Sequence, residues 1–180
     1  MISTSSGSAL GPTLETERLI LRPIDMEADF QGYYEAHSDP ETVRYIGGKT
    51  LDEAQTWRTM AMILGHHHTR GYSFLSVIEK ATGTWVGRVG PWNPHGWPEP
   101  EVGWTIHPAH TRKGFAKEAG QACMDYVRDG LGWPSVIHVI LDGNIGSERT
   151  AIALGSKRLR GIEGLPGITD EYCHIYGQTF

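Results

Sequence analysis

Cysteine is scarce in this sequence, and its scarcity excludes the sites that depend on it. The two cysteines, Cys123 and Cys173, lie far apart and match no spacing typical of metal-binding or redox sites. Cys123 falls on the apolar side of a predicted helix, so we expect it to pack in the core. The sequence therefore predicts neither a cysteine-bound metal nor a redox-active pair of thiols.

Long apolar runs are also absent. No run approaches the ~20 residues that a membrane-spanning helix requires, and the segment 1–12 has neither the basic start nor the apolar centre of a signal peptide. Positive charge is in deficit, because 16 lysines and arginines against 21 aspartates and glutamates give a net charge of −5. This balance argues against a nucleic-acid-binding surface. We expect a cytoplasmic protein without a membrane or nucleic-acid partner.

What the sequence does contain is typical of one globular domain. Its 180 residues are 39% hydrophobic and 21% charged, which is enough apolar material for a sizeable core. No internal repeat is visible. Residues 1–13 are rich in serine and threonine, which predicts a flexible N-terminal arm. We assign residues 14–180 to a single domain.

Hydrophobic patterns predict a mixed α/β fold. Alternating or β-rich runs predict strands over 14–23, 72–78, 84–89, 101–106 and 136–141, with a closing pair of strands within 157–180. Apolar residues at helical spacing predict helices over 25–36, 51–65, 115–127 and 145–154. The run 136–141 is almost wholly apolar, as expected for a strand buried on both faces, so a crossover helix should join it in parallel to 101–106.

The ends of the two early helices have recognisable signals. Asp25 is the predicted N-cap of the first helix. Thr50 and Glu53 have the spacing of a capping box for the second, which we expect to end at Gly65. Its buried face is predicted to contain Ala54, Trp57, Ala61 and Leu64. This pair of helices is expected to line the substrate side of the protein.

The segment 105–119, T-I-H-P-A-H-T-R-K-G-F-A-K-E-A, joins a strand to a helix through a basic turn. The start of a helix leaves N–H groups unpaired and has a positive partial charge, so a phosphate bound there gains several hydrogen bonds. Gly114 allows the backbone to approach a ligand, and Arg112 and Lys113 add positive charge. The alternative is the ordinary strand–turn–helix connection of any α/β unit.

Two other segments imitate functional motifs. Gly48-Lys49-Thr50 resembles part of a P-loop, but Val43 occupies the place of the required first glycine and no strand precedes it. Three consecutive histidines, 66–68, suggest a metal site, yet adjacent side chains on a helix point in different directions. We expect no metal and no nucleotide site at these positions.

Three stretches resemble the GCN5-related N-acetyltransferase (GNAT) superfamily. R-K-G-F-A-K-E-A at 112–119 is similar to its R/Q-x-x-G-x-G/A coenzyme-A signature, and N-x-x-S-x-x-x-A-x-x-L-G from Asn144 matches a second signature. L-E-T-E-R-L-I-L-R-P at 14–23 resembles the opening of the RimJ/RimL branch, which contains ribosomal-protein N-terminal acetyltransferases. The resemblance implies a central mixed, largely antiparallel sheet of six to seven strands, splayed between strands 4 and 5 and flanked by about four helices.

The same resemblance implies acetyl-CoA as co-substrate and no metal. The backbone of Thr105, Ile106 and His107 would pair with the pantetheine arm. The side chain of Asn144 would bond the pantetheine, and Ser147 would lie near the sulfur. The pyrophosphate would be held by the N–H groups of Arg112, Lys113, Gly114, Phe115, Ala116 and Lys117.

The implied reaction is direct attack of a primary amine on the thioester. Glu101 opens a strand in the context E-V-G-W and is the candidate base, the alternative being a solvated strand end. Many family members place a tyrosine seven residues after the asparagine as general acid, whereas this chain has Ala151 there. Ser147 is the candidate substitute, the alternative being a residue that only caps its helix.

The acceptor is not identified by these residues. Trp92 and Trp97 lie in a Pro- and Gly-rich segment, 90–100, which is either a loop folded over its own small core or a flap that contacts substrate. The leading hypothesis is an N-acetyltransferase acting on a primary amine, including a protein N-terminal α-amine. The alternatives are a small-molecule amine or antibiotic acetyltransferase and a non-catalytic acyl-CoA-binding module. We expect a monomer or a homodimer.

Overall fold

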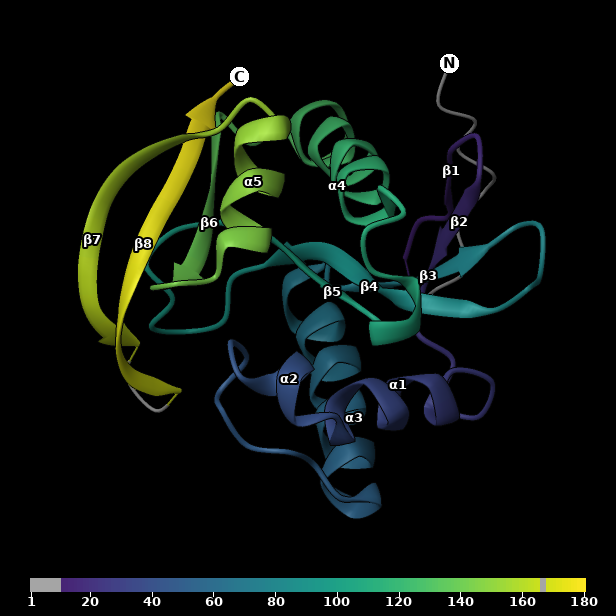
Figure 1. Ribbon diagram of the computed structural model, residues 1–180. Coiled ribbons are helices and arrows are strands. Elements are labelled where there is room, and N and C mark those ends of the chain that lie inside the picture. The colour runs from purple at the N-terminus through teal and green to yellow at the C-terminus, as the bar shows by residue number, and fades with distance from the viewer. Residues whose placement is uncertain (1–10, 166–167) are drawn as a thin grey trace.

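A single open sheet of eight strands organises the chain. The computed structural model describes residues 11–165 and 168–180, and the strand order is β1-β2-β3-β4-β5-β6-β8-β7 (Figure 1). Neighbouring strands are antiparallel except for the pair β5 and β6. The strands are β1 Leu14–Glu15, β2 Leu19–Arg22, β3 Leu75–Glu79, β4 Trp85–Trp92, β5 Glu101–Ile106, β6 Ser135–Leu141, β7 Lys157–Leu165 and β8 Thr169–Thr179. Residues 1–10 of the predicted N-terminal arm lie outside the described residues.

The sheet has more strands than expected because the predicted strand 14–23 is two strands. β1 and β2 pair antiparallel, with Leu14 opposite Leu21. Between them the N–H of Thr16 donates to the carbonyl of Leu19 at 3.0 Å and reverses the chain. Leu14, Leu19 and Leu21 are all buried, so the tight hairpin places the apolar residues of both strands in one core.

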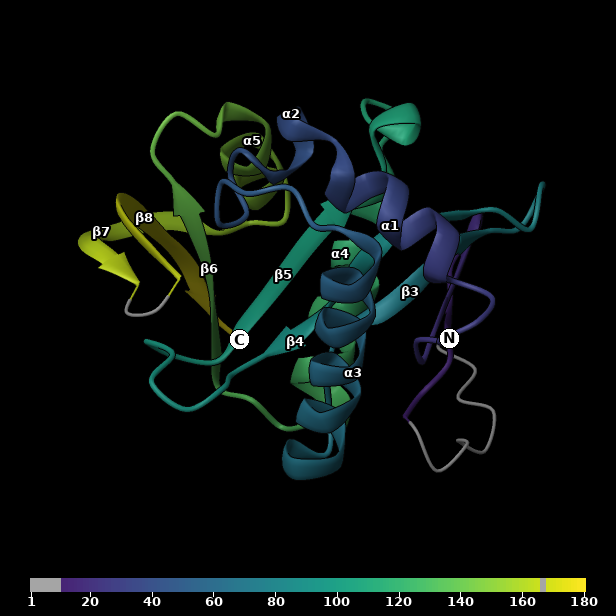
Figure 2. The ribbon, with the colours of Figure 1, turned by 90° about the horizontal axis from the view of Figure 1, so that it is seen from below.

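Helices cover both faces of the sheet (Figures 1 and 2). Residues of α1 and α3 pack with Phe74, Trp85 and Trp92 on one face, where α2 packs against α1, whereas α4 packs with β1 to β5 on the other face. α5 lies beside α4 over β6 and β8. The helices are α1 Phe30–Ser38, α2 Pro40–Val43, α3 Glu53–Arg70, α4 Phe115–Asp125 and α5 Ile145–Ala153, with a 3₁₀ turn at Pro108–His110 and a π-helical turn at Tyr126–Gly130. Cys123 is buried in α4, as expected.

The predicted boundaries of the early helices were wrong. α1 begins at Phe30 because the Asp25 carboxylate accepts bonds from the N–H groups of Glu27 and Ala28 and closes a separate turn. Asp29 then lies before the helix, where its carboxylate pairs with Arg22 at 2.6 Å.

α3 also differs from its prediction. Its capping box is Asp52 with Gln55, and the helix continues through Gly65 to Gly71, whose φ of +81° ends it. The buried face is shifted from the predicted one, so that Trp57 is 55% exposed. The buried side chains are Thr56, Met60, Ile63 and His66.

β4 extends further than predicted and includes Pro91 and Trp92. Pro91 lies opposite Val102 of β5, and β3 begins only at Leu75, opposite Val89. A proline is tolerated there because no β3 residue is paired with β4 beyond Val89. The Pro- and Gly-rich loop is therefore shorter than expected and follows Trp92.

β5 and β6 part soon after they meet. They pair in parallel at Glu101 and Ile137, and the N–H of Ile137 donates to the carbonyl of Pro100 at 3.0 Å. β6 instead pairs along its whole length with β8. The two strands diverge toward their C-terminal ends, as the family resemblance implied for the fourth and fifth strands (Figure 2). None of the helices within the described ranges is both long and apolar enough to cross a membrane.

Candidate functional site

A cleft of about 920 Å³ lies where β5 and β6 diverge. Its walls come from β4, β5, the start of α4, the end of β6, the start of α5 and the α2–α3 side of the sheet. Of the predicted site residues, Glu101, Thr105, Ile106, Arg112, Gly114, Phe115, Ala116, Lys117, Asn144, Ser147, Trp92 and Trp97 line it. His107 and Lys113 do not. The His107 ring lies toward Glu35 of α1, with 3.5 Å between Nε2 and the carboxylate.

The basic turn, residues 111–117, has the geometry of an anion site. In the part of the chain that the structure describes, the N–H groups of 112–117 have no hydrogen-bond acceptor. Gly114 precedes α4 with φ of +83°, and Arg112 has φ of +61°, which is uncommon for a residue with a side chain. Turns with left-handed residues form concave groups of N–H donors that bind anions. These donors therefore form a candidate anion site.

Arg18 supports this turn from behind. Its Nη1 donates to the carbonyl of Lys113 at 3.0 Å, and its guanidinium lies 4.8 Å from the centre of the Phe115 ring. Glu118 holds Arg18 in place through an ion pair of 2.6 Å. No local pattern reveals this role, because Arg18 and Lys113 are 95 residues apart in sequence.

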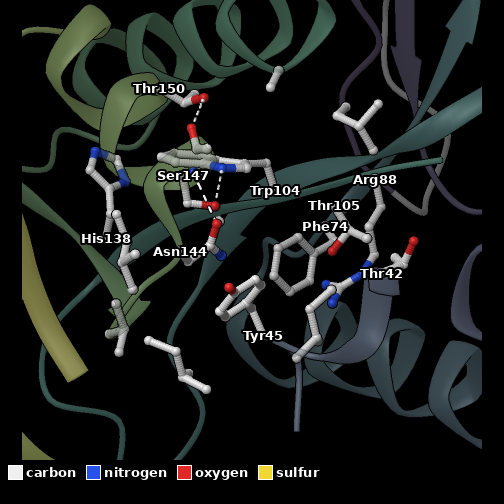
Figure 3. A pocket seen from close by; sticks show the side chains of 18 of the residues that line it. Thr42, Tyr45, Phe74, Arg88, Trp104, Thr105, His138, Asn144, Ser147 and Thr150 are labelled. Atoms are coloured by element: carbon white, nitrogen blue, oxygen red, sulfur yellow. Dashed lines mark hydrogen bonds between the residues drawn. The ribbon is translucent and has the colours of Figure 1, made fainter. Parts of the chain in front are cut away.

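Asn144 and Ser147 lie together at the start of α5 (Figure 3). The Asn144 Oδ1 accepts a bond from the N–H of Ser147 at 3.1 Å, which caps the helix. The Ser147 hydroxyl accepts a bond from Trp104 Nε1 at 3.2 Å, so its own hydrogen can be donated to another group. Ala151 is fully buried in a cluster with Ile140 and Tyr176, and this position lies in the core.

Glu101 is a buried carboxyl group, so the alternative of a solvated strand end is wrong. It is 6% exposed, and its oxygens accept bonds from Trp97 Nε1 at 2.6 Å and from the N–H of Val139 at 3.1 Å. Burial raises the pKa of Glu101 to about 7, although these two hydrogen bonds and the charge of Arg88 act in the opposite direction. At neutral pH both protonation states are therefore populated, which suits a general base.

The two tryptophans line the cleft in different ways. Trp92 is 9% exposed at the end of β4, and its ring stacks on His66 at 4.2 Å and on Phe74 at 5.0 Å between centroids. Trp97 lies in the following loop and bonds Glu101. Both pack against the core beneath α1 and α3 while also facing the cleft.

His138 joins the two diverging strands. Its Nδ1 donates to the carbonyl of Val102 at 2.6 Å, and Nε2 accepts from the hydroxyl of Ser156 at 3.0 Å. Burial lowers the pKa of His138 to about 4, so the ring is neutral at physiological pH. Trp104 lies against this ring with 4.8 Å between centroids, which fixes the indole that bonds Ser147.

Sequence reasoning missed Arg88, Phe74 and Tyr45, which also line the cleft. Arg88 of β4 lies with its guanidinium carbon 4.0 Å from the centre of the Phe74 ring. Tyr45 follows α2, and its hydroxyl donates to the carbonyl of Gly143 at 3.2 Å, so it connects the α2 side to the α5 side (Figure 3). None of these positions belongs to a recognisable motif, and only the folded chain brings them together.

The first residue of the histidine run 66–68 has a structural role. His66 is buried, its Nδ1 donates to the carbonyl of Tyr72, and its Nε2 accepts from the N–H of Asn93. Both of its ring nitrogens are therefore used within the protein. Among residues 11–165 and 168–180, no three His, Cys, Asp or Glu side chains are grouped so that they could hold a metal ion.

Comparisons with known proteins agree with this geometry. A family model described as an acetyltransferase (GNAT) domain matches residues 18–157. The uncharacterized N-acetyltransferase YoaA of Bacillus subtilis is 27% identical over 175 residues, which cover 94% of this chain and 92% of that protein. The crystal structure of an acetyltransferase from Agrobacterium tumefaciens has a TM-score of 0.80 at 27% identity, covering 99% of this chain and 100% of that one. The structure of RimL, a ribosomal L7/L12 α-N-protein acetyltransferase in complex with coenzyme A, shares the fold with a TM-score of 0.73 at 13% identity, covering 91% and 95%.

Proposed function

Because the chain belongs to the acetyltransferase (GNAT) family, whose members transfer an acetyl group to an amine, we propose that its acceptor is a primary α-amine and that Glu101 is the base. The observation that supports this proposal is the buried Glu101 carboxyl group in the wall of the cleft, with a pKa raised to about 7. A carboxyl group with this pKa is about half ionised at neutral pH, and its ionised form can accept a proton from the amine.

The choice of an α-amine follows from matching the two pKa values. An α-amine has a pKa of about 8, whereas a lysine amine has a pKa of about 10.4. Proton transfer to Glu101 is therefore unfavourable by about one pKa unit from an α-amine and by about three pKa units from a lysine amine. Because both Glu101 oxygens already accept bonds, we propose that a water passes the proton between the amine and the carboxylate.

The cofactor side of the cleft supports the same assignment. Bound acetyl-CoA would supply the acetyl thioester that the amine attacks. The N–H groups of 112–117 would hold its pyrophosphate, and the edge of β5 at Thr105 and Ile106, which is not paired with β6, would face the pantetheine arm. The free hydrogen of the Ser147 hydroxyl is the donor we propose for the sulfur, with Trp104 holding the serine oxygen in place.

Release of free thiol from acetyl-CoA tests this proposal. We expect release with peptides that present a free N-terminal α-amine and much slower release with polyamines at pH 7.5. Amino-terminally blocked peptides with the same sequence are the matched control and should give none. Binding of acetyl-CoA without thiol release from any amine would show a non-catalytic acyl-CoA-binding module instead.

A further inference from the structure

Arg88 is a cation in the cleft that forms no close ion pair within the described residues, although its charge acts on the more distant Glu101 carboxylate. Its Nε is buried and has no hydrogen-bond acceptor, and none of the ion pairs among the described residues includes it. A partly buried charge is costly unless another group pairs with it. We infer that Arg88 binds an anionic group of the acceptor, so that the substrate is a primary amine that also bears a carboxylate or another anion. This inference rests on the proposed function.

The position of Arg88 places it on the acceptor side of the cleft. Its guanidinium lies over the rings of Phe74 and Tyr33, which belong to the core beneath α1 and α3, and not to the α4 side. Figure 3 shows the Arg88 side chain beside Phe74 within the pocket. The aromatic surface holds the guanidinium plane and leaves its edge available for a planar anion.

Arg88 and Glu101 lie at opposite ends of one aromatic surface. On the sheet, Arg88 is opposite Thr105 and Trp92 is opposite Glu101, so the backbone positions of Arg88 and Glu101 are four residues apart along the strands, about 13 Å. Phe74 lies between them, since a Cβ on Gly103 would be 3.1 Å from its ring and 3.5 Å from a Glu101 oxygen. An acceptor whose amine lies near Glu101 would therefore reach Arg88 with an anionic group that is several bonds from that amine.

Acidic groups at the rim do not neutralise Arg88. The Asp39 carboxylate accepts bonds from the N–H and hydroxyl of Thr42 and caps α2. Glu41 lines the same rim and is exposed. Among the described residues, neither carboxylate forms an ion pair with Arg88.

The test compares acceptors that differ only in one charge. One pair is a tripeptide amide with glutamate or glutamine after a free N-terminal alanine, and the other is the single amino acids glutamate α-amide and glutamine α-amide, so that only one member of each pair bears an anion. Wild-type kcat/KM should be at least 10-fold higher for the glutamate member of a pair, since charge-assisted bidentate bonds are the strongest hydrogen bonds of arginine. The pair that shows the preference identifies the source of the anion, a peptide or a free aminocarboxylate.

Variants of Arg88 assign the preference to this residue. R88Q should lower kcat/KM for the glutamate acceptor by 10-fold or more and leave the glutamine acceptor nearly unchanged, and R88K should retain part of the preference. Rates are compared at pH 9, because the positive charge of Arg88 also lowers the pKa of Glu101 and its removal must not alter the ionised fraction. R112Q, at the coenzyme-A end, is the matched control and should weaken coenzyme-A binding without changing the preference.

Calorimetry separates failure of this inference from failure of the proposed function. With coenzyme A present and no acetyl group to transfer, the glutamate acceptor should bind wild type more tightly than R88Q. Equal wild-type rates for both members of each pair, or equal losses in R88Q, would overturn the inference while leaving the acetyltransferase assignment intact. Weaker coenzyme-A binding by R88Q would also overturn it, because Arg88 would then belong to the cofactor. Absence of turnover with every amine would overturn both.

Discussion

The chemistry at residue scale depends on how one carboxyl group is held. Glu101 loses most of its solvation on folding, and two N–H donors restore part of what its charged form loses. The donor from Val139 belongs to the backbone of β6, whereas the donor from Trp97 is a side chain of a loop. The loop therefore adjusts the pKa of the proposed base through one side-chain hydrogen bond.

Replacement of Trp97 should move the pH profile of the reaction. The bond from Trp97 stabilises the ionised carboxylate, so W97F should raise the pKa of Glu101 further above its ordinary value, by about one unit. The acidic limb of kcat/KM then shifts to higher pH, and the rate recovers toward wild type at pH 9. W92F removes a comparable indole without a bond to Glu101 and should leave the limb in place. An unshifted limb in W97F would show that the bond does not control the pKa.

At the scale of elements, the start of α4 and the turn before it form one functional unit. The left-handed Arg112 and Gly114 direct free N–H groups into the cleft, and Arg18 and Glu118 hold the turn from the opposite side. A Cβ on Gly114 would lie 3.4 Å from the Arg18 guanidinium, so a side chain added there would disturb the support more than the anion site. Ala116 lines the cleft in the first turn of α4 and is the better position to test.

A negative charge at residue 116 should have opposite effects on stability and on cofactor binding. An aspartate in the first turn of a helix is favourable by about 0.3–1 kcal/mol, because it complements the helix dipole. A116D should therefore be at least as stable as A116N, yet it should bind coenzyme A at least 10-fold more weakly through repulsion of the pyrophosphate. Calorimetry and thermal melting of the two variants, which have nearly the same shape, measure both effects. Equal affinities would exclude the basic turn as the pyrophosphate site.

At the scale of the whole molecule, the cleft exists because two halves of the sheet separate. β1 to β5 form one half of the sheet and β6 to β8 form the other. The two halves are joined by a single parallel pairing at Glu101 and by the hydrogen bond from His138 to Val102. The proposed base thus lies where the halves meet, and the proposed cofactor site lies where they part. Tyr45 connects the two sides of the cleft through Gly143.

The segments that the sequence predicted well are those whose structure depends on signals from neighbouring residues. The strand–turn–helix segments that contain β5 with α4 and β6 with α5 were predicted because apolar periodicity and turn residues are signals within a few positions. The predicted buried face of α3 was wrong because Trp57 is the largest apolar residue of the pattern, whereas the positions that are buried include a threonine and a histidine. The predicted length of β4 was wrong because the sequence does not reveal that β3 stops pairing with β4 before Pro91, which is why a proline is tolerated there.

The residues that complete the candidate site could not be predicted from local signals. Arg18 supports the basic turn through a hydrogen bond to Lys113, which is 95 residues away in sequence. Arg88 has no distinguishing feature in the sequence, and its position over Phe74 and Tyr33 is set by the fold. Glu101 was chosen from its family context, but its burial depends on Trp97 and on the N–H of Val139. Such properties arise from contacts between distant segments, which periodicity does not contain.

The turnover of Glu101→Gln across pH 6 to 10, on an acceptor that the wild type uses, tests the proposed mechanism most directly. The variant keeps the size of the side chain and removes the proton acceptor, so kcat should fall by about 10²-fold or more at neutral pH. The deficit should shrink as the pH passes about 8 and the α-amine loses its proton unaided. Coenzyme-A affinity should stay near the wild-type value, which verifies that the cleft is intact. A deficit that is constant from pH 6 to 10 would contradict the account and remove Glu101 as the base.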